Sequence, residues 1–298
     1  MDLNPNNAYG VEKEDVARMA ELAGMEFVDH GEDEYNEGFP SEDLIYGPEQ
    51  EKDLLAEMAN VAFSTPGDDY AQYICENRER VYRAARMSSA VREMLVLGYR
   101  LGVSSGSGAC MNDLGALYYM GDLVEQDYAK AAELYEMAAD AGCFQSIINL
   151  GYIYEYGRTG KPDHAKAYQW YSLAAALAPS SEAVYKLGDM FSRGRAVPQD
   201  RSKAYRLYER SLELARDDAE FAQPAIRIAS MLIDPDAPSC GIDRNPLRAL
   251  ALYQRAEIGL RIDIANGMTY YAKRLREAIE GQEKARELVE MDIFVIDR

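Results

Sequence analysis

The sequence predicts an all-α protein built as a stack of helical hairpins. The prediction depends on one phrase that occurs three times at nearly constant spacing, each copy followed by a second phrase at a fixed distance. The copies read Leu114, Gly115, Tyr118, Gly121; Leu150, Gly151, Tyr154, Gly157; and Leu187, Gly188, Phe191, Gly194. The glycines after Leu are 36 and 37 residues apart. A period of this length, made of helical phrases, is typical of stacked hairpins and not of one central core.

The first phrase of each unit predicts a helix that approaches its neighbour closely. Leu114 and Tyr118 are four residues apart and therefore share one side of a helix. Gly115 lies beside them in mid-helix, where Gly costs about 1 kcal/mol relative to Ala. We expect this cost to be offset by close contact with the partner helix. Gly121 follows the periodic stretch, at the place where a left-handed residue ends a helix.

The second phrase predicts a capped helix with a packing face. Asp127, Asp163 and Asp200 each precede an apolar periodic run, which is the position of an N-cap acceptor. Small and large residues then alternate at helical spacing, at Ala131, Tyr135 and Ala138 in the first unit. Each unit is therefore predicted to be helix, short loop, helix.

The combined pattern, LG-x2-Y-x2-G-x5-D-x2-KA-x3-Y-x2-A over residues 107–215, is similar to the Sel-one-like repeat, an α/α relative of the tetratricopeptide repeat. The resemblance implies a right-handed α/α superhelix of about four to five hairpins. A fourth copy is degraded, with Ile228-Ala229 in place of Leu-Gly, so we expect looser packing there. Tyr82 and Tyr99 stand 36 residues before Tyr118 and Tyr135 and suggest a degenerate leading unit at 68–103.

We divide the chain into four parts: an acidic N-terminal arm (1–46), N-terminal helices with the degenerate unit (47–105), the repeats (106–261), and a C-terminal capping helix and tail (262–298). Residues 1–50 carry a balance of −12 of the total net charge of −19. Two alternatives stand for the arm: a partly disordered, solubilising segment that folding does not need, or a short helix that docks on the stack. A second helix is predicted at 48–63 and a long one at 268–291.

The composition excludes several classes of partner and compartment. A net charge of −19 opposes nucleic acid and anionic membrane surfaces, which bind Lys and Arg. No apolar run reaches the roughly 18 residues of a membrane span, and the N-terminus lacks the pattern of a secretory signal. Cys75, Cys110, Cys143 and Cys240 show no metal-ligand spacing. We therefore expect a cytoplasmic protein with free thiols.

The sequence offers no enzymatic site. Only His30 and His164 are available for a catalytic pair or a zinc site, and neither has suitable partners. The acidic stretch from Asp29 lacks the spacing of a calcium loop, and the glycine-rich residues 102–108 lack the Lys of a phosphate loop. We predict no enzymatic activity, no metal and no cofactor.

The first helix of each unit lines the concave side in tetratricopeptide-like stacks, and the resemblance therefore implies a binding groove there. The predicted protein-binding residues are Asn112, Tyr119, Tyr152, Glu155, Glu182, Tyr185, Asp189 and Ser192. These positions include aromatic and acidic residues but no Lys or Arg, which favours a peptide or protein segment that carries Lys or Arg. The alternative is that they form ordinary solvated helix surface.

The sequence therefore predicts a non-catalytic scaffold or adaptor that binds a partner protein. The alternative is a structural or regulatory subunit that self-associates, as a homo-oligomer, through the ends of the stack. A third hypothesis, an unrecognised hydrolase, would need a cluster of His or carboxylate groups that the sequence does not provide.

Overall fold

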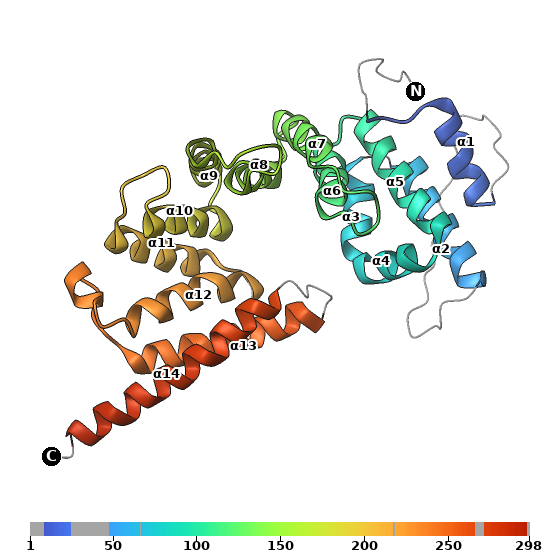
Figure 1. Ribbon diagram of the computed structural model, residues 1–298. Helices are drawn as coiled ribbons and strands as arrows, with labels where there is room; N and C mark the ends of the chain where they lie inside the picture. The colour runs from blue at the N-terminus through green and yellow to red at the C-terminus, as the bar shows by residue number, and fades with distance from the viewer. Residues whose placement is uncertain (1–8, 25–47, 66, 217, 266–270, 297–298) are drawn as a thin grey trace. The chain divides into compact units, whose positions relative to one another are not determined.

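The structure, a computed structural model, describes residues 9–24, 48–65, 67–216, 218–265 and 271–296. Every regular element within these residues is helical, which confirms the predicted all-α class (Figure 1). The chain divides into two compact units, Met1–Asn149 and Leu150–Arg298. The boundary falls inside α8 (Phe144–Tyr156) and therefore within the predicted repeat region.

The first unit contains seven helices before α8 among the described residues: α1 (Lys13–Leu22), α2 (Pro48–Ser64), α3 (Asp68–Glu76), α4 (Arg78–Met87), α5 (Ser89–Ser104), α6 (Gly108–Met120) and α7 (Tyr128–Asp140). The second contains α9 (His164–Leu177), α10 (Ser181–Arg193), α11 (Arg201–Leu214), α12 (Asp218–Leu232), the short 3-10 helix η1 (Ala237–Cys240), α13 (Pro246–Ala265) and α14 (Ala272–Ile296). Consecutive helices pack as antiparallel hairpins, including α6 with α7 and α10 with α11.

The ends of the repeat helices are fixed by the residues that the sequence indicated. Asp127 accepts hydrogen bonds from the backbone N–H groups of residues 129 and 130, and Asp163 and Asp200 each accept one from the residue three positions later. Gly121 and Gly194 end α6 and α10 in the left-handed conformation, with φ of 70° and 65°. These caps satisfy backbone groups that the helices leave unpaired.

The glycine of each Leu-Gly pair accommodates a tyrosine ring of the second helix. A Cβ atom added to Gly115 or Gly188 would lie 2.9 Å from Tyr135 or 2.6 Å from Tyr208. On Gly151 it would overlap the Tyr171 ring still further. Tyr135, Tyr171 and Tyr208 are all buried. The predicted close helix contact is thus formed between a bare Cα and a ring edge.

The fourth hairpin, α12 with α13, is as closely packed as the others, and the expectation of looser packing there is wrong. Ala229, Ala249 and Ala256 are fully buried along this pair, and their small side chains allow the helices to approach without a glycine. Tyr253 instead packs against a glycine of the following helix, Gly281 of α14. The Gly–Tyr contact is therefore kept, with a different partner helix.

The N-terminal helix α1 packs on α2 and α5. Met19 is fully buried, and Arg18 donates to both carboxylate oxygens of Glu93 on α5 at 2.9 and 3.1 Å. Arg100 of α5 holds the backbone carbonyl of Gly10 and the carboxylate of Asp15. The buried contacts of α1 disagree with the alternative in which the N-terminal arm is a solubilising segment that folding does not need. Residues 25–47, which hold much of the predicted acidic arm, lie outside the described residues.

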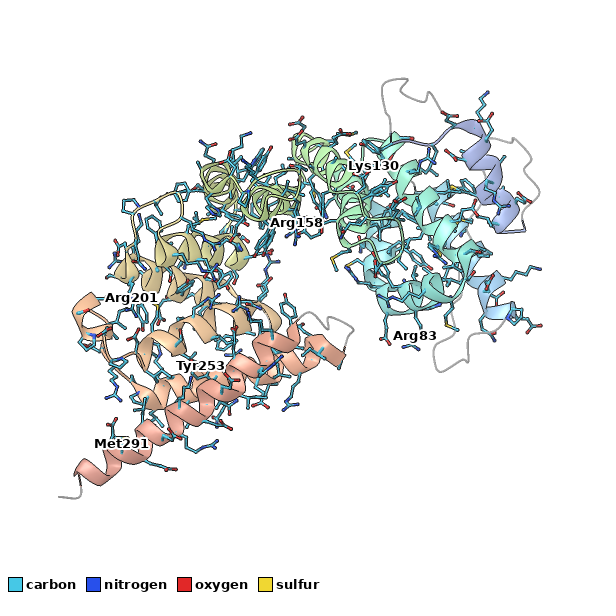
Figure 2. All side chains as sticks on the ribbon, viewed as in Figure 1. Arg83, Lys130, Arg158, Arg201, Tyr253 and Met291 are labelled. Atoms are coloured by element: carbon cyan, nitrogen blue, oxygen red, sulfur yellow. The ribbon has the colours of Figure 1, made fainter. Side chains whose placement is uncertain are left out.

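The C-terminal helix α14 runs beside α13 (Figure 1). Its backbone stays helical to Ile296, beyond the predicted end of this helix at 291. Met291 lies towards the end of α14 and is 62% exposed (Figure 2). In the first unit, Tyr82 and Tyr99 lie on the packed helices α4 and α5; a degenerate repeat at 68–103 stays a prediction.

We predict that Gly151→Leu lowers the free energy of unfolding by about 3 kcal/mol, because the new side chain must displace the buried Tyr171 ring. Gly160→Leu is the matched control, since no atom lies within 4 Å of the Cβ atom that this substitution adds. Urea unfolding followed by circular dichroism measures both. Equal stability of the two variants would contradict a steric role for Gly151.

We predict that Met19→Ala lowers the free energy of unfolding by about 2–5 kcal/mol, the usual range for a buried Met replaced by Ala. Met87→Ala removes the same atoms at a position that is 66% exposed, and should change stability little. The measurement is again urea unfolding. If Met19→Ala behaves like Met87→Ala, α1 does not contribute to the stability of the first unit.

Candidate protein-interaction face

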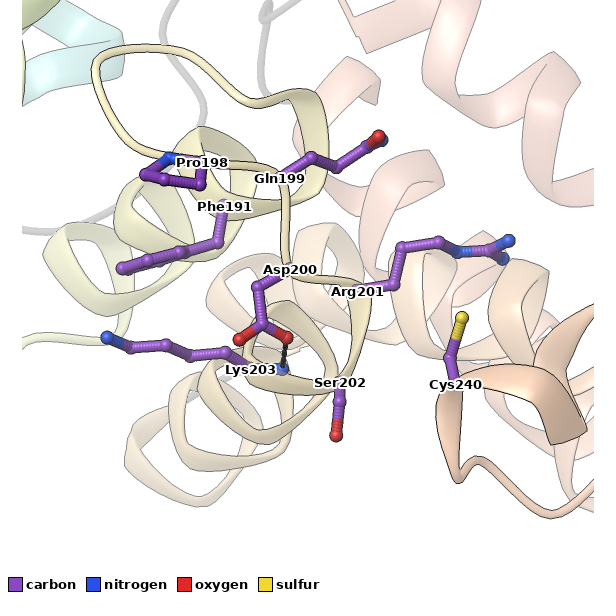
Figure 3. Close-up of a pocket in the computed structure, with 8 residues that line it drawn as sticks. All are labelled: Phe191, Pro198, Gln199, Asp200, Arg201, Ser202, Lys203 and Cys240. Atoms are coloured by element: carbon purple, nitrogen blue, oxygen red, sulfur yellow. Dashed lines mark hydrogen bonds between the residues drawn. The ribbon is translucent and has the colours of Figure 1, made fainter.

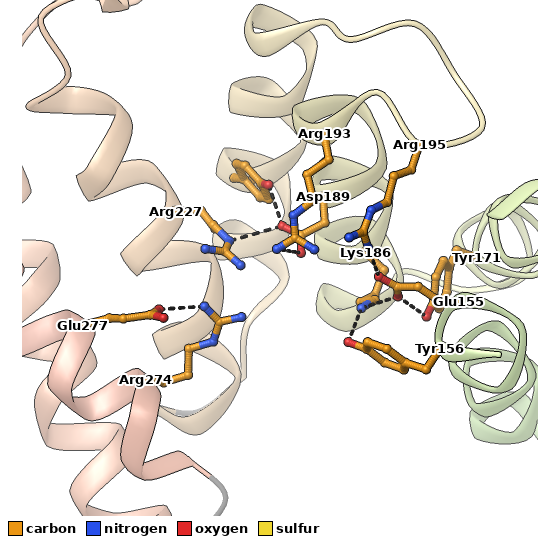
Figure 4. A network of polar contacts seen from close by, with 11 residues as sticks. Glu155, Tyr156, Tyr171, Lys186, Asp189, Arg193, Arg195, Arg227, Arg274 and Glu277 are labelled. Carbon is orange, nitrogen blue, oxygen red and sulfur yellow. Dashed lines mark hydrogen bonds and ion pairs between the residues drawn. The ribbon is translucent and has the colours of Figure 1, made fainter. Parts of the chain in front are cut away.

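Side chains from α8, α10, α12, α14 and the loop after α10 lie together in the second unit and form three groups of ion pairs (Figure 4). We call this surface the charged face. Its charged members are Glu155, Lys186, Asp189, Arg193, Arg195, Arg227, Arg274 and Glu277. Two buried carboxylates organise it.

The first carboxylate, Glu155 on α8, is paired with two cations. Its oxygens lie 2.5 Å from Lys186 Nζ and 3.2 Å from Arg195 Nη1, and the hydroxyl of Tyr171 donates to it at 2.9 Å. The side chains of Glu155 and Lys186 are only 1% and 4% exposed. Burial alone would lower the pKa of Lys186, but the Glu155 carboxylate outweighs it and the pKa is raised. Lys186 therefore stays protonated inside the unit.

Aromatic rings enclose the same lysine. The Nζ atom of Lys186 lies 4.6, 5.3 and 5.5 Å from the ring centroids of Tyr152, Tyr156 and Tyr171. Tyr152 and Tyr156 are stacked with centroids 6.0 Å apart. Contacts between a cation and ring faces partly replace the water that Lys186 loses.

The second carboxylate, Asp189 on α10, is likewise shared. Arg193 Nη2 lies 3.1 Å and Arg227 Nε 3.2 Å from its oxygens, and the hydroxyl of Tyr208 donates at 2.7 Å. Burial would raise the pKa of Asp189, but Arg227 and Arg193 outweigh it and the pKa is lowered. At the α14 side of the charged face, Arg274 pairs with Glu277 at 2.7 Å.

The predicted binding residues of the second unit are thus mostly engaged within the fold. Glu155 and Asp189 are buried ion-pair partners, and Glu182 accepts a hydrogen bond from the Tyr152 hydroxyl at 2.7 Å. The remaining two have packing or backbone contacts: the Tyr185 ring lies 5.8 Å from that of Tyr208, and the carbonyl of Ser192 accepts from Gln199 at 2.8 Å.

In the first unit, Asn112 is also used internally. It accepts from Asn149 at 2.9 Å and donates to Asp113 at 3.0 Å, and Asp113 is held by the Tyr99 hydroxyl. Burial raises the pKa of Asp113. Tyr119 is half-buried and packs edge-on against Tyr128, with ring centroids 5.3 Å apart.

The expected acidic surface must therefore be corrected. Glu155 and Asp189 are covered by cations, so the negative charge predicted for solvent is neutralised within the fold. The cations lie off the predicted helix stripe at 185, 189 and 192: Lys186 and Arg193 stand on a different stripe of α10, and Arg195 and Arg227 lie outside that helix. One signal was available: Lys186 and Arg227 both stand two residues before the Leu-Gly glycine or its replacement, Ala229.

A separate pocket of about 490 Å³ lies at the turn between α10 and α11 (Figure 3). Its polar groups already have structural contacts. Asp200 caps α11 with a 2.8 Å hydrogen bond to the N–H of Lys203, Arg201 pairs with Asp234, and the Lys203 ammonium lies 3.9 Å from the centroid of Phe191. These contacts stabilise the turn between α10 and α11, and we therefore do not interpret the pocket as a binding site.

Two further properties concern metals and membranes. Within the described ranges, no three His, Cys, Asp or Glu side chains are grouped so that they could hold a metal ion. His164 opens α9, and His30 lies outside the described residues. None of the helices that the structure describes combines the length and apolar character needed to cross a bilayer.

The architecture and the charged face define the class of protein as an α/α repeat protein. A family model described as Sel1 repeat matches residues 108–143, 145–179, 181–215 and 237–257. This chain therefore contains four Sel1 repeats, and the resemblance found in its sequence is confirmed. The last match covers only the region from η1 into α13, in agreement with the altered first phrase of the fourth copy.

Three solved structures are similar to parts of the chain. The first is c5321, a protective antigen of uropathogenic Escherichia coli strains with an SLR fold, with 25% identity over 66% of this chain and 42% of that one and a TM-score of 0.46. The second is a Sel1 repeat protein from Oxalobacter formigenes, with 19% identity over 78% of this chain and 99% of that one and a TM-score of 0.49. The third is the immunity protein Pa5087 from Pseudomonas aeruginosa, with 19% identity over 67% of this chain and 85% of that one and a TM-score of 0.36. The match to c5321 spans less than half of that protein's length. A search of curated proteins gave no match.

We predict that Glu155→Lys lowers the free energy of unfolding by about 3–5 kcal/mol, because it leaves Lys186 buried beside a second cation. Glu136→Lys makes the same charge change on an exposed part of α7 and should be nearly neutral. Thermal and urea unfolding measure both variants. An unchanged stability of Glu155→Lys would show that Glu155 is not a buried partner of Lys186.

Proposed function

We propose that this protein is a non-catalytic scaffold that binds a segment of a partner protein on the charged face of its second unit. Repeats of the Sel1 family generally serve in protein–protein interaction. The observation that carries the proposal is the fixed position of partly exposed arginines: Arg193 and Arg195 are 37% and 36% exposed, yet each is anchored to a buried carboxylate. Side chains that are held in place before binding lose less conformational freedom when a ligand arrives.

The charged face also offers apolar contact. Tyr156 is 47% exposed beside the cations, and an aromatic ring next to guanidinium groups is a common composition of protein interfaces. The thiols of Cys75, Cys110, Cys143 and Cys240 are unpaired, which supports a reducing, cytoplasmic setting for this interaction. A ligand rich in Lys or Arg is no longer favoured, because the carboxylates meant to receive it are already paired.

The test is a selection of random displayed peptides on the full chain. We expect peptides that bind the wild type and lose affinity by roughly tenfold for the double variant Arg193→Gln/Arg195→Gln. This variant leaves Glu155 with Lys186 and Asp189 with Arg227, so both buried carboxylates keep one cation.

The control is Arg206→Gln/Arg210→Gln on α11, which removes the same charge. Arg210 is 58% exposed, and within the described residues its ion pair is with its helix neighbour Glu213. Recovery of no peptide, or of peptides that bind both double variants equally well, would contradict binding on the charged face.

A further inference from the structure

The charged face holds more cations than carboxylates. Five cations (Lys186, Arg193, Arg195, Arg227 and Arg274) share three carboxylates (Glu155, Asp189 and Glu277). One further charge of each sign lies beside the stacked tyrosines: Glu182 accepts a hydrogen bond from Tyr152, and the guanidinium group of Arg158 lies over the Tyr156 ring. The local excess is therefore positive, on a chain whose net charge is −19.

The two signs of charge also differ in how far they reach solvent. The central carboxylates, Glu155 and Asp189, are 1% and 5% exposed in their side chains. Arg193, Arg195 and Arg274 are 37%, 36% and 28% exposed. A ligand that approaches Arg193 and Arg195 therefore meets guanidinium groups with the two central carboxylates beneath them, whereas Glu277 is itself 35% exposed beside Arg274.

The guanidinium groups keep unused hydrogen-bond donors. Each has five N–H donors and no acceptor, and within the described residues Arg193, Arg195 and Arg274 each contact a carboxylate through one terminal nitrogen. At Arg227 the shortage is visible within the fold: Nε contacts Asp189, whereas Nη2 is buried and has no hydrogen-bond partner among the described residues.

We propose that the charged face binds an acidic segment, in which Asp or Glu carboxylates meet the arginines and an apolar residue contacts Tyr156. This inference rests on the proposed scaffold function and specifies its ligand. The planar fork of Arg matches a carboxylate with two parallel hydrogen bonds. The small local excess of cations suits a few carboxylates, whereas a nucleic acid would bring a long row of phosphates towards a strongly acidic protein.

The experiment compares defined labelled peptides on the full chain by fluorescence anisotropy. The probe alternates Glu and Leu, and two companions of the same length carry Gln or Lys in place of Glu. We expect the Glu probe to bind, the Gln probe to bind at least roughly tenfold more weakly, and the Lys probe not to bind. Raising the salt concentration should weaken the Glu probe, because partly exposed charges are screened.

The double variant Arg193→Gln/Arg195→Gln should lose roughly tenfold in affinity for the Glu probe, and Arg274→Gln should also weaken it, while Arg206→Gln/Arg210→Gln should not. Thermal unfolding of each variant shows that the loss is not caused by unfolding. Equal binding of the Glu and Gln probes, or preference for the Lys probe, would overturn the inference.

The selection of displayed peptides separates this inference from the proposed function. Selected peptides that bind at the charged face but are not enriched in Asp and Glu would leave the scaffold function standing and overturn the acidic ligand. Failure to select any peptide would count against the scaffold function itself. A single-stranded oligonucleotide that binds more tightly than the Glu probe would assign the charged face to phosphates and likewise overturn the acidic segment.

Discussion

The contact between a glycine on one helix and a tyrosine ring on the next is the constraint on which the second unit depends. Tyr171 and Tyr208 fill the space left by the missing side chains of Gly151 and Gly188. Their hydroxyl groups then reach past the glycines to Glu155 and Asp189. A phenylalanine would fill the same space but would leave a buried carboxylate without one of its donors. In these two hairpins the packing thus fixes the position of a charge.

This coupling explains how a strongly acidic chain presents cations at one place. A carboxylate buried beside a tyrosine hydroxyl needs further partners, because an uncompensated buried charge is costly. Glu155 obtains them from α10 and the following loop, through Lys186 and Arg195. Asp189 obtains them from α10 and α12. Glu155 and Asp189 are therefore buried, and the arginines that pair with them are partly exposed to solvent.

The sequence could predict those parts of the fold that depend on neighbours within one hairpin. The caps at Asp127, Asp163 and Asp200 and the close helix approach at the Leu-Gly glycines follow from local spacing, whereas the structure identifies a tyrosine ring as the group in contact. The ion pairs of Glu155 with Lys186 and Arg195, and of Asp189 with Arg227, could not be predicted, because they join different helices or a loop and depend on how each helix is rotated. Only the pairs within one helix, Asp189 with Arg193 and Arg274 with Glu277, have a local spacing. Met19 shows the same limit, because the surface that buries it belongs to α2 and α5, which are distant from it in the sequence.

The repeat separates positions that hold the fold from positions that can vary. The Leu-Gly glycine recurs in three copies and the tyrosine of the second helix in four, whereas the residue two places before the glycine, or before Ala229, changes from Asp113 to Asn149, Lys186 and Arg227. In the described structure these four side chains lie in polar networks of their own units. Exchange among acid, amide and base at this position leaves the Gly–Tyr contact untouched. The chemistry of the first-helix surface can therefore be altered repeat by repeat without changing how the hairpins stack.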